Sequence, residues 1–397
     1  MSGVRSGVRS GVSGALAIVG AADTAVGVVP DRSPTELCVE AALAAMADAD
    51  IRKDEVDGLI TCNAFAEPIM YHAEAVAEYL QIFPKLCITA GTGGGTTLAV
   101  IQQAAAAILA GAANTIVIAM ADSLRSFMTR EQAMLTQSST GHPQYEQPYG
   151  ITVPAYYALI AQAHMAEYGT TPAQYAQVAV SGRAHAARND SAQMRDPISV
   201  EDVLGSRLIA DPLHLLDCSL VSDGGSAIVV TAAERAGDFP HPPVYLLGYG
   251  EGHSHEHISQ AASLTTSAAR DSGSRAFAMA GCTPADIDLA QLYDCFTPTV
   301  LIELEDLGFC GKGEGGAFLQ TGATLPGGSL PVNTHGGMLS HCHPGNPGAM
   351  FAITETVWQL RGSAGARQVA NARRALVHAQ GGIMSSHATA IFSRDLG

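Results

Sequence analysis

One stretch of the chain recurs in its second half, and this repeat limits the available folds more than any other feature of the sequence. Residues 45–60 run from an alanine-rich helix end through a short acidic turn into an apolar run, and residues 278–292 repeat that order. A similar match joins residues 108–119 to residues 360–379. Two copies of one pattern in a single chain predict two halves of like topology. The alternative is chance similarity between alanine-rich helices.

Short apolar runs alternate with helical patterns from Ala15 onward, which is typical of a sheet covered by helices. Ser33-Pro34-Thr35-Glu36 combines an N-cap serine, an early proline and a capping-box glutamate, so a helix should extend to about Ala49. The other expected elements are helices at residues 69–82, 96–110 and about 347–360, and strands at residues 15–21, 58–61 and 115–119. The sequence therefore predicts an α/β fold.

The repeat also suggests how the chain is divided. Residues 15–122 together with 221–240 should form the N-terminal half, and residues 241–397 the C-terminal half. Residues 123–220 are richer in Tyr, His, Gln and Pro, and they are expected to form a mostly helical insertion over the active face. Residues 1–14 lack the apolar centre of a signal peptide and are expected to be a flexible tail.

Composition narrows the range of partners. The chain of 397 residues has a hydrophobic fraction of 47%, which suits a large buried core, and a formal charge of −16. Nucleic acid and anionic membranes need clustered positive charge, so neither is expected as a partner. No apolar run approaches the roughly 18 residues that cross a membrane. The eight scattered cysteines contain no CxxC pair, which indicates reduced thiols in the cytoplasm.

A loop at residues 333–345 holds the densest group of reactive side chains. His335, His341, His343 and Cys342 lie among glycines there, directly before an expected helix. Glycines let the backbone approach a ligand, and histidine exchanges protons at neutral pH. The alternatives are a metal site or ordinary loop polarity. Structural zinc is not expected because the loop lacks a second Cys/His pair, so we predict no metal.

Several segments in a fixed order carry a family resemblance. They are Arg183–Asn189, Ser222–Ala227, Tyr293–Thr297, Gly311–Gly316, the histidine loop and Gly381-Gly382. Their order and spacing resemble the thiolase superfamily, and in particular the sterol carrier protein x type thiolases. The resemblance implies a five-layered αβαβα thiolase fold of two similar halves, a homodimer, a CoA thioester as substrate and no permanently bound cofactor.

Family members carry a nucleophilic cysteine at the N-terminus of a buried helix, and here that cysteine is missing. The matching segment, Thr89–Thr97, contains no cysteine in any register. The vacant region comprises Gly91, Gly93, Gly94 and Gly95. Cys87 lies earlier, in a strand-like run, and is expected in the core. Since a helix N-terminus lowers a thiol pKa, losing this cysteine removes the step that forms an acyl-enzyme.

The remaining family positions carry over one by one. His343-Pro344 matches the catalytic His-Pro pair, with Cys342 where glycine is usual, so Cys342 is either a displaced nucleophile or a loop thiol pointing elsewhere. Tyr293 stands where the family has His or Asn; a phenol there can hydrogen-bond a thioester or hydroxyl oxygen, unless it is a core tyrosine. His378 aligns near the family's second cysteine and either replaces it or faces the core.

The resemblance thus proposes two sets of site residues. The catalytic candidates are Tyr293, His341, Cys342, His343 and His378. The candidates for binding CoA or substrate are Asn333, His335, Gly336, Gly337, Gly381 and Gly382.

A chain that keeps the glycine loops and His-Pro but lacks the thiol should act on CoA thioesters without an acyl-enzyme. Retro-aldol cleavage of a β-hydroxyacyl-CoA fits best. Some actinobacterial sterol side-chain proteins of the family resemble this chain in their tyrosine, and they pair with a small zinc-ribbon/OB-fold subunit. The alternatives are an acetyl-CoA acyltransferase with a displaced nucleophile, or a non-catalytic acyl-CoA or lipid-binding subunit.

Overall fold

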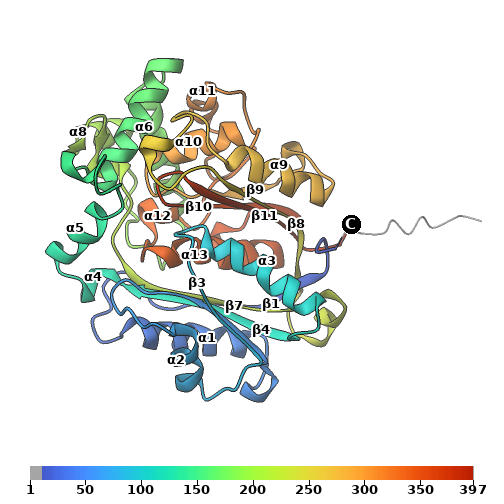
Figure 1. Cartoon of the computed structure of the whole chain (residues 1–397). Coiled ribbons are helices and arrows are strands. Elements are labelled where there is room, and N and C mark those ends of the chain that lie inside the picture. Colours follow the sequence, from blue (N-terminus) through green and yellow to red (C-terminus); the bar gives the residue numbers. More distant parts are fainter. Residues whose placement is uncertain (1–10, 397) are drawn as a thin grey trace, which may run out of the picture.

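The computed structural model describes residues 11–396. Two sheet layers lie one above the other, with helices α3 (Thr96–Leu109) and α13 (Met350–Arg361) between them (Figure 1). Helices α1 (Pro34–Asp48) and α2 (His72–Leu80) cover one outer face, and α9 (Ala269–Ala280) and α10 (Thr297–Asp306) cover the other. This confirms the five-layered αβαβα prediction.

Hydrogen bonds link nine strands of the described chain into one continuous ladder, in the order β3-β2-β4-β7-β1-β8-β11-β10-β9. The strands of the first half are β1 (Leu16–Asp23), β2 (Gly58–Cys62), β3 (Leu86–Ala90), β4 (Thr115–Ser123) and β7 (Asp223–Ala232). Those of the second half are β8 (Val244–His253), β9 (Leu289–Gln291), β10 (Arg374–Gly381) and β11 (Ser386–Ser393). Only Ala17 and Ile18 of β1 pair with β8, so the ladder is narrow where the halves meet.

The repeat seen in the sequence is a repeat of structure. In the first half α1 leads through a 3-10 turn, Lys53–Glu55, into β2, and in the second half α9 leads through Pro284–Asp286 into β9. Strand β2 is parallel to β4, which is antiparallel to β7; β9 is likewise parallel to β10, which is antiparallel to β11. The predicted two similar halves are therefore confirmed, and chance similarity is excluded.

Local sequence explains how the outer helices form and pack. Ser33 Oγ accepts a hydrogen bond from the Glu36 amide, and the Glu36 carboxylate accepts one from the Ser33 amide, which closes the predicted capping box. On β8, Gly248, Gly250 and Gly252 face α9, and a Cβ at any of them would overlap carbonyl oxygens of that helix. Glycine at every second position lets α9 lie directly on the strand.

Two predicted helices begin later than expected. The helix expected from residue 69 starts at His72, because Tyr71 has a non-helical backbone. The helix expected from residue 347 starts at Met350, after a 3-10 turn at Asn346–Ala349. A Cβ on Gly348 in this turn would lie 2.8 Å from the His343 ring, so the tight turn makes room for that histidine.

Between β4 and β7 the chain is mostly helical and leaves the sheet layers (Figure 1). Its elements are α4 (Leu124–Phe127), α5 (Arg130–Ser138), α6 (Val153–Tyr168), α7 (Pro172–Ala186), α8 (Val200–Gly205), and the hairpin β5 (Leu208–Ala210) and β6 (Leu213–His214). Two short helices, α11 (Gly315–Gln320) and α12 (Gly337–Ser340), follow in the second half. The domain limits given above remain a prediction.

The predicted tail at residues 1–14 falls largely outside the described residues. Its last part forms a turn in which the Gly14 amide donates to the Leu246 carbonyl, and Val12 packs against the core. Among the described helices, none combines the length and apolar character needed to cross a membrane.

Candidate active site

A cavity of about 440 Å³ opens where the glycine-rich loops of the two halves meet. Gly93 and Gly94, just before α3, line it from the first half, and Gly381 and Gly382, at the end of β10, line it from the second. A Cβ on Gly93 would lie 2.8 Å from the Cα of Gly381. The backbone atoms of the two loops are therefore in direct contact, which is possible because these glycines have no side chain.

The space beside Gly94 is filled by the side chain of Tyr293, from the segment after β9. A Cβ on Gly94 would lie 2.5 Å from Cζ of Tyr293, and closer still to its hydroxyl group. No side chain fits at Gly94 while Tyr293 holds this position, because real Cβ atoms do not approach other atoms so closely. A side chain at Gly94, one position of the region without a cysteine, would therefore meet this phenol and, as closely, the Gln380 carbonyl oxygen, whereas a Cβ on Gly91 would meet no atom within 4 Å.

Tyr293 and His343 face each other across the cavity. Their hydroxyl group and Nε2 atom are 3.4 Å apart, and the rings meet edge to face. The Nδ1 atom of His343 is 2.9 Å from the Ser219 hydroxyl, and its amide donates to Ser222 Oγ. These contacts fix the ring so that Nε2 points toward the phenol.

Burial makes both groups neutral at physiological pH. It lowers the pKa of His343 to about 4, and it raises the pKa of Tyr293 well above its ordinary value. His343 is therefore a neutral imidazole able to accept a proton, and Tyr293 is a protonated phenol able to donate one.

Gln380 and Tyr157 complete the polar end of the cavity. Gln380 Nε2 donates to the Tyr157 hydroxyl (2.7 Å) and lies 3.2 Å from Cys295 Sγ, while the Tyr157 hydroxyl donates to the Gly382 carbonyl. Tyr157, on α6, also stacks on Phe296 with ring centres 4.4 Å apart. The network holds the Gly381-Gly382 backbone beside the reactive pair.

The rest of the cavity wall is apolar and comes in large part from residues 123–221. It is formed by Phe65, Leu124, Val153, Pro154, Ile209, Leu215, Leu220, Val221 and Ile383. A cavity with one polar end and long apolar walls suits a ligand whose reacting group is polar and whose remainder is hydrophobic.

Two of the predicted catalytic residues lie in the core instead. Cys342 points toward the Asp223 carbonyl, and burial raises the pKa of its thiol well above the ordinary value, so it is neither exposed to the cavity nor a thiolate. His378 contacts Thr389 (2.8 Å) and His387 (3.0 Å) inside the sheet, which answers the question left open by the sequence. The side chain of β10 that reaches the cavity is Gln380.

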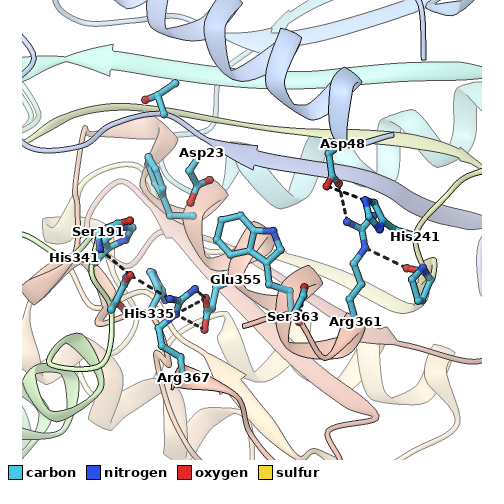
Figure 2. A pocket seen from close by; sticks show the side chains of 15 residues that line it. Asp23, Asp48, Ser191, His241, His335, His341, Glu355, Arg361, Ser363 and Arg367 are labelled. Atoms are coloured by element: carbon cyan, nitrogen blue, oxygen red, sulfur yellow. Dashed lines mark hydrogen bonds and ion pairs between the residues drawn. The ribbon is translucent and has the colours of Figure 1, made fainter. Parts of the chain in front are cut away.

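The other predicted site residues of the histidine loop do not line this cavity, although Gly345 does. His335 and His341 line a separate cavity (Figure 2). Asn333 accepts a hydrogen bond from the Leu292 amide. A Cβ on Gly336 would overlap Ala186, and a Cβ on Gly337 would overlap the Asp294 side chain. Of the predicted CoA-binding residues, only Gly381 and Gly382 line the cavity.

Sequence reasoning missed several cavity residues. Tyr157, Ser219 and Gln380 were not singled out, although Cys295 and Phe296 belong to a recognised segment. A tyrosine pair in an alanine-rich helix was the available signal for Tyr157. Within the described residues, no group of three or more His, Cys, Asp or Glu side chains is placed to hold a metal ion.

The fold and this site define an enzyme of the thiolase superfamily, and the chain belongs to that family. Residues 16–234 match the thiolase N-terminal domain, and residues 250–394 match the thiolase C-terminal domain-like family. The predicted resemblance is therefore confirmed.

Relatives named for two different reactions, a lyase and an acetyltransferase, match nearly the whole chain. The 17-hydroxy-3-oxo-4-pregnene-20-carboxyl-CoA lyase of Mycobacterium tuberculosis is 39% identical, over 94% of this chain and 98% of its own. The acetyl-CoA acetyltransferase of Methanothermobacter thermautotrophicus is 34% identical, over 96% of this chain and 99% of its own. The solved structure of the Ltp2-ChsH2(DUF35) aldolase superposes with a TM-score of 0.86 at 35% identity, over 96% of this chain and 98% of that chain.

Proposed function

We propose that this enzyme cleaves the Cα–Cβ bond of a β-hydroxyacyl-CoA by a retro-aldol reaction, without an acyl-enzyme. The observation that carries this proposal is that the Tyr293 phenol fills the space a side chain at Gly94 would need. The lyase and aldolase relatives support it. The long apolar walls favour a large hydrophobic acyl part, such as a steroid side chain.

The reactive pair accounts for every proton in the reaction. His343 accepts the proton of the β-hydroxyl group; a carbonyl forms at Cβ, the Cα–Cβ bond breaks, and its electron pair passes into the thioester as an enolate. Tyr293 then donates a proton to Cα and recovers one from His343 across their 3.4 Å contact. The N-terminus of α3, at Gly94 and Gly95, offers partial positive charge for the enolate oxygen.

A second candidate, acyl transfer, is favoured by the acetyltransferase relative. It needs a thiolate in the cavity, and among the described residues the cavity thiols are Cys218 and Cys295. Burial raises the pKa of Cys218 to about 12 and raises that of Cys295 further. Neither thiol is activated, so the retro-aldol reaction fits the site better.

The deciding experiment compares two substrates. The enzyme is incubated either with a β-hydroxyacyl-CoA or with a 3-oxoacyl-CoA plus free CoA, and products and intact protein are analysed by mass spectrometry. We expect a ketone or aldehyde and a shortened acyl-CoA from the first substrate only, with no added mass on the protein. An acyl group attached to any cysteine would overturn the retro-aldol proposal.

Two variants test the assigned residues. Tyr293→Phe and His343→Ala should each lose most turnover while CoA-thioester binding, measured by calorimetry, stays close to wild type. Tyr245→Phe, on β8 outside the cavity, is the matched control and should keep full activity. Full activity in both site variants would contradict the assignment.

We also propose a cytoplasmic homodimer that takes a small zinc-ribbon/OB-fold partner subunit. The related aldolase is named with a second component, ChsH2(DUF35), which supports the partner. Edge strand β3 and the exposed Met70, Tyr71 and Phe83 near it support an interface between two copies. Light scattering of the purified chain, alone and with such a subunit, measures both stoichiometries.

A further inference from the structure

A second cavity, of about 540 Å³, runs along α13 between the two sheet layers (Figure 2). It shares no lining residue with the catalytic cavity among the residues the structure describes. The proposed reaction uses none of its side chains. It is lined by charged groups, two aromatic rings and the two histidines that the catalytic cavity excludes.

The charged groups of this cavity leave one carboxyl group without a partner of opposite charge. Arg367 pairs with Glu355 (2.9 Å), and Arg361 pairs with Asp48 (2.7 Å), as Figure 2 shows. Asp23 is the third carboxyl group on the wall. Within the described residues it has no ion pair, the Thr354 hydroxyl donates to it, and burial raises its pKa to about 7. The cavity therefore has one acidic group more than its arginines neutralise.

His335 and His341 have unused hydrogen-bonding capacity. The side chains are 4% and 3% exposed, and the Nδ1 atom of each lacks a hydrogen-bond partner within the described residues. Burial lowers the pKa of both rings, to about 3 for His341, so they are neutral and add no positive charge. Both Nδ1 atoms are themselves almost without accessible surface, so the two rings shape the wall of the cavity and do not present these atoms to a ligand.

Aromatic rings supply the remaining part of the wall. Phe351 and Trp358 lie on α13 and face the cavity, and His341 packs edge to face on Phe351. The face of an aromatic ring attracts a cation, and indole attracts it most strongly. A carboxylate beside aromatic rings is a common way to hold an ammonium group.

We infer that this cavity binds a small organic cation with one ammonium group. Asp23 is its counter-ion, and Trp358 and Phe351 form the aromatic wall, with the neutral rings of His335 and His341 beside them. An anion would be repelled by the Asp23 carboxylate. A neutral molecule would leave Asp23 partly protonated at neutral pH, whereas a cation gives the carboxylate the partner that it lacks.

The chain offers a direct readout, because Trp358 is its only tryptophan. Three probes of matched shape are titrated while Trp358 fluorescence is recorded: cyclohexylammonium, cyclohexanol and cyclohexanecarboxylate. We expect a saturable change with cyclohexylammonium, and binding at least about tenfold weaker for the other two. Equal binding of the alcohol, tighter binding of the carboxylate, or no saturable change with the cation at roughly ten millimolar would overturn the inference.

Variants separate this site from general effects of charge and from the catalytic cavity. Asp23→Asn keeps the shape and should weaken cyclohexylammonium binding about tenfold. Asp54→Asn removes an exposed carboxyl group elsewhere and should leave binding unchanged. Tyr293→Phe should also bind the cation normally, so the result does not depend on the proposed reaction. Thermal melting checks that Asp23→Asn is folded. Phe351→Leu, which removes one aromatic ring from the wall, should also weaken cyclohexylammonium binding and provides a second test should Asp23→Asn fail to fold. Wild-type affinity in a folded Asp23→Asn variant contradicts the assignment.

Discussion

At the residue scale, the proposed chemistry depends on the space between Gly94 and Tyr293. The phenol lies where a side chain at Gly94 would have to lie, so the protein cannot hold both. The group that is present is an acid with a neutral imidazole beside it. This pairing suits a reaction that moves protons and forms no covalent intermediate.

Adding one methyl group at this contact should disable the enzyme. A Cβ on Gly94 would overlap Tyr293 and the Gln380 carbonyl, so Gly94→Ala forces at least one of them to move, and overpacking of this kind destabilises a fold by about 1–3 kcal/mol. We expect a lower melting temperature and a loss of most turnover in the retro-aldol assay. Gly91→Ala is the control, because a Cβ there meets nothing within 4 Å. Normal kinetics in Gly94→Ala would show that the contact is not needed.

The pH profile should reflect the burial of His343. Its imidazole accepts a proton only while neutral, and burial lowers its pKa to about 4. Activity therefore falls as pH drops through about 4, and it is retained near pH 6, where an ordinary histidine is already half protonated. The measurement is kcat/KM against pH, with circular dichroism at each pH to confirm folding. An acid limb centred near 6.5 would mean that His343 is exposed to solvent in the free enzyme.

The sequence located the reactive pair but could not assign the rest of the histidine loop. Tyr293 and His343 were predicted because segments of fixed order carry them. His341 and Cys342 lie next to His343 in the sequence, yet they face other parts of the protein. Side-chain direction in an irregular loop depends on backbone angles, such as the positive φ of Gly336 and Gly337, that spacing does not reveal.

At the element scale, helices with clear end signals were predicted accurately. Helix α1 starts where Ser33 and Glu36 indicate and ends one residue before the expected Ala49. The start of α13 could not be predicted, because the 3-10 turn before it depends on room for His343, a contact across the loop. Local signals fix an element's end only where no tertiary contact overrides them.

The cap of α1 can be tested by itself. Ser33→Ala removes the side-chain acceptor for the Glu36 amide, and a lost cap lowers the free energy of unfolding by about 1 kcal/mol. Because α1 lies on an outer face away from the catalytic cavity, turnover should not change. Urea denaturation measures the stability, and Ser33→Asp, which can also cap the helix, should restore it. Unchanged stability in Ser33→Ala would show that the helix end is held by packing alone.

At the scale of the whole molecule, one arginine side chain links the two halves by hydrogen bonds. Arg361, at the end of α13, donates to the Val19 carbonyl on β1, to Asp48 at the end of α1, and to the Pro242 carbonyl before β8. Its side chain is only 4% exposed. The direct ladder between the halves is two residue pairs long, so this side chain adds polar contacts to the packing of α3 and α13 against both halves.

Removing these hydrogen bonds should lower the free energy of unfolding of the whole chain. Arg361→Met removes the arginine partner of Asp48 and the donor to two carbonyl groups, while the Ala21 amide still donates to Asp48. We expect a loss of about 3 kcal/mol, discounted because Asp48 is partly exposed. The melting temperature should fall by roughly 5 °C in calorimetry. Arg373→Met removes an exposed pair with Asp395 and is the control, with an effect below about 1 kcal/mol. Equal melting temperatures for the two variants would contradict this role.

The main-chain contact between Gly93 and Gly381 fixes the separation of the two glycine-rich loops. Since no rotatable side chain lies between the halves at that point, van der Waals contact of the two main chains sets their separation, and we expect it to stay constant whatever the size of the bound molecule. The apolar walls come largely from a different stretch of the chain. An engineer, or natural selection, can therefore reshape the walls for new acyl groups while the proton-transfer machinery keeps its dimensions.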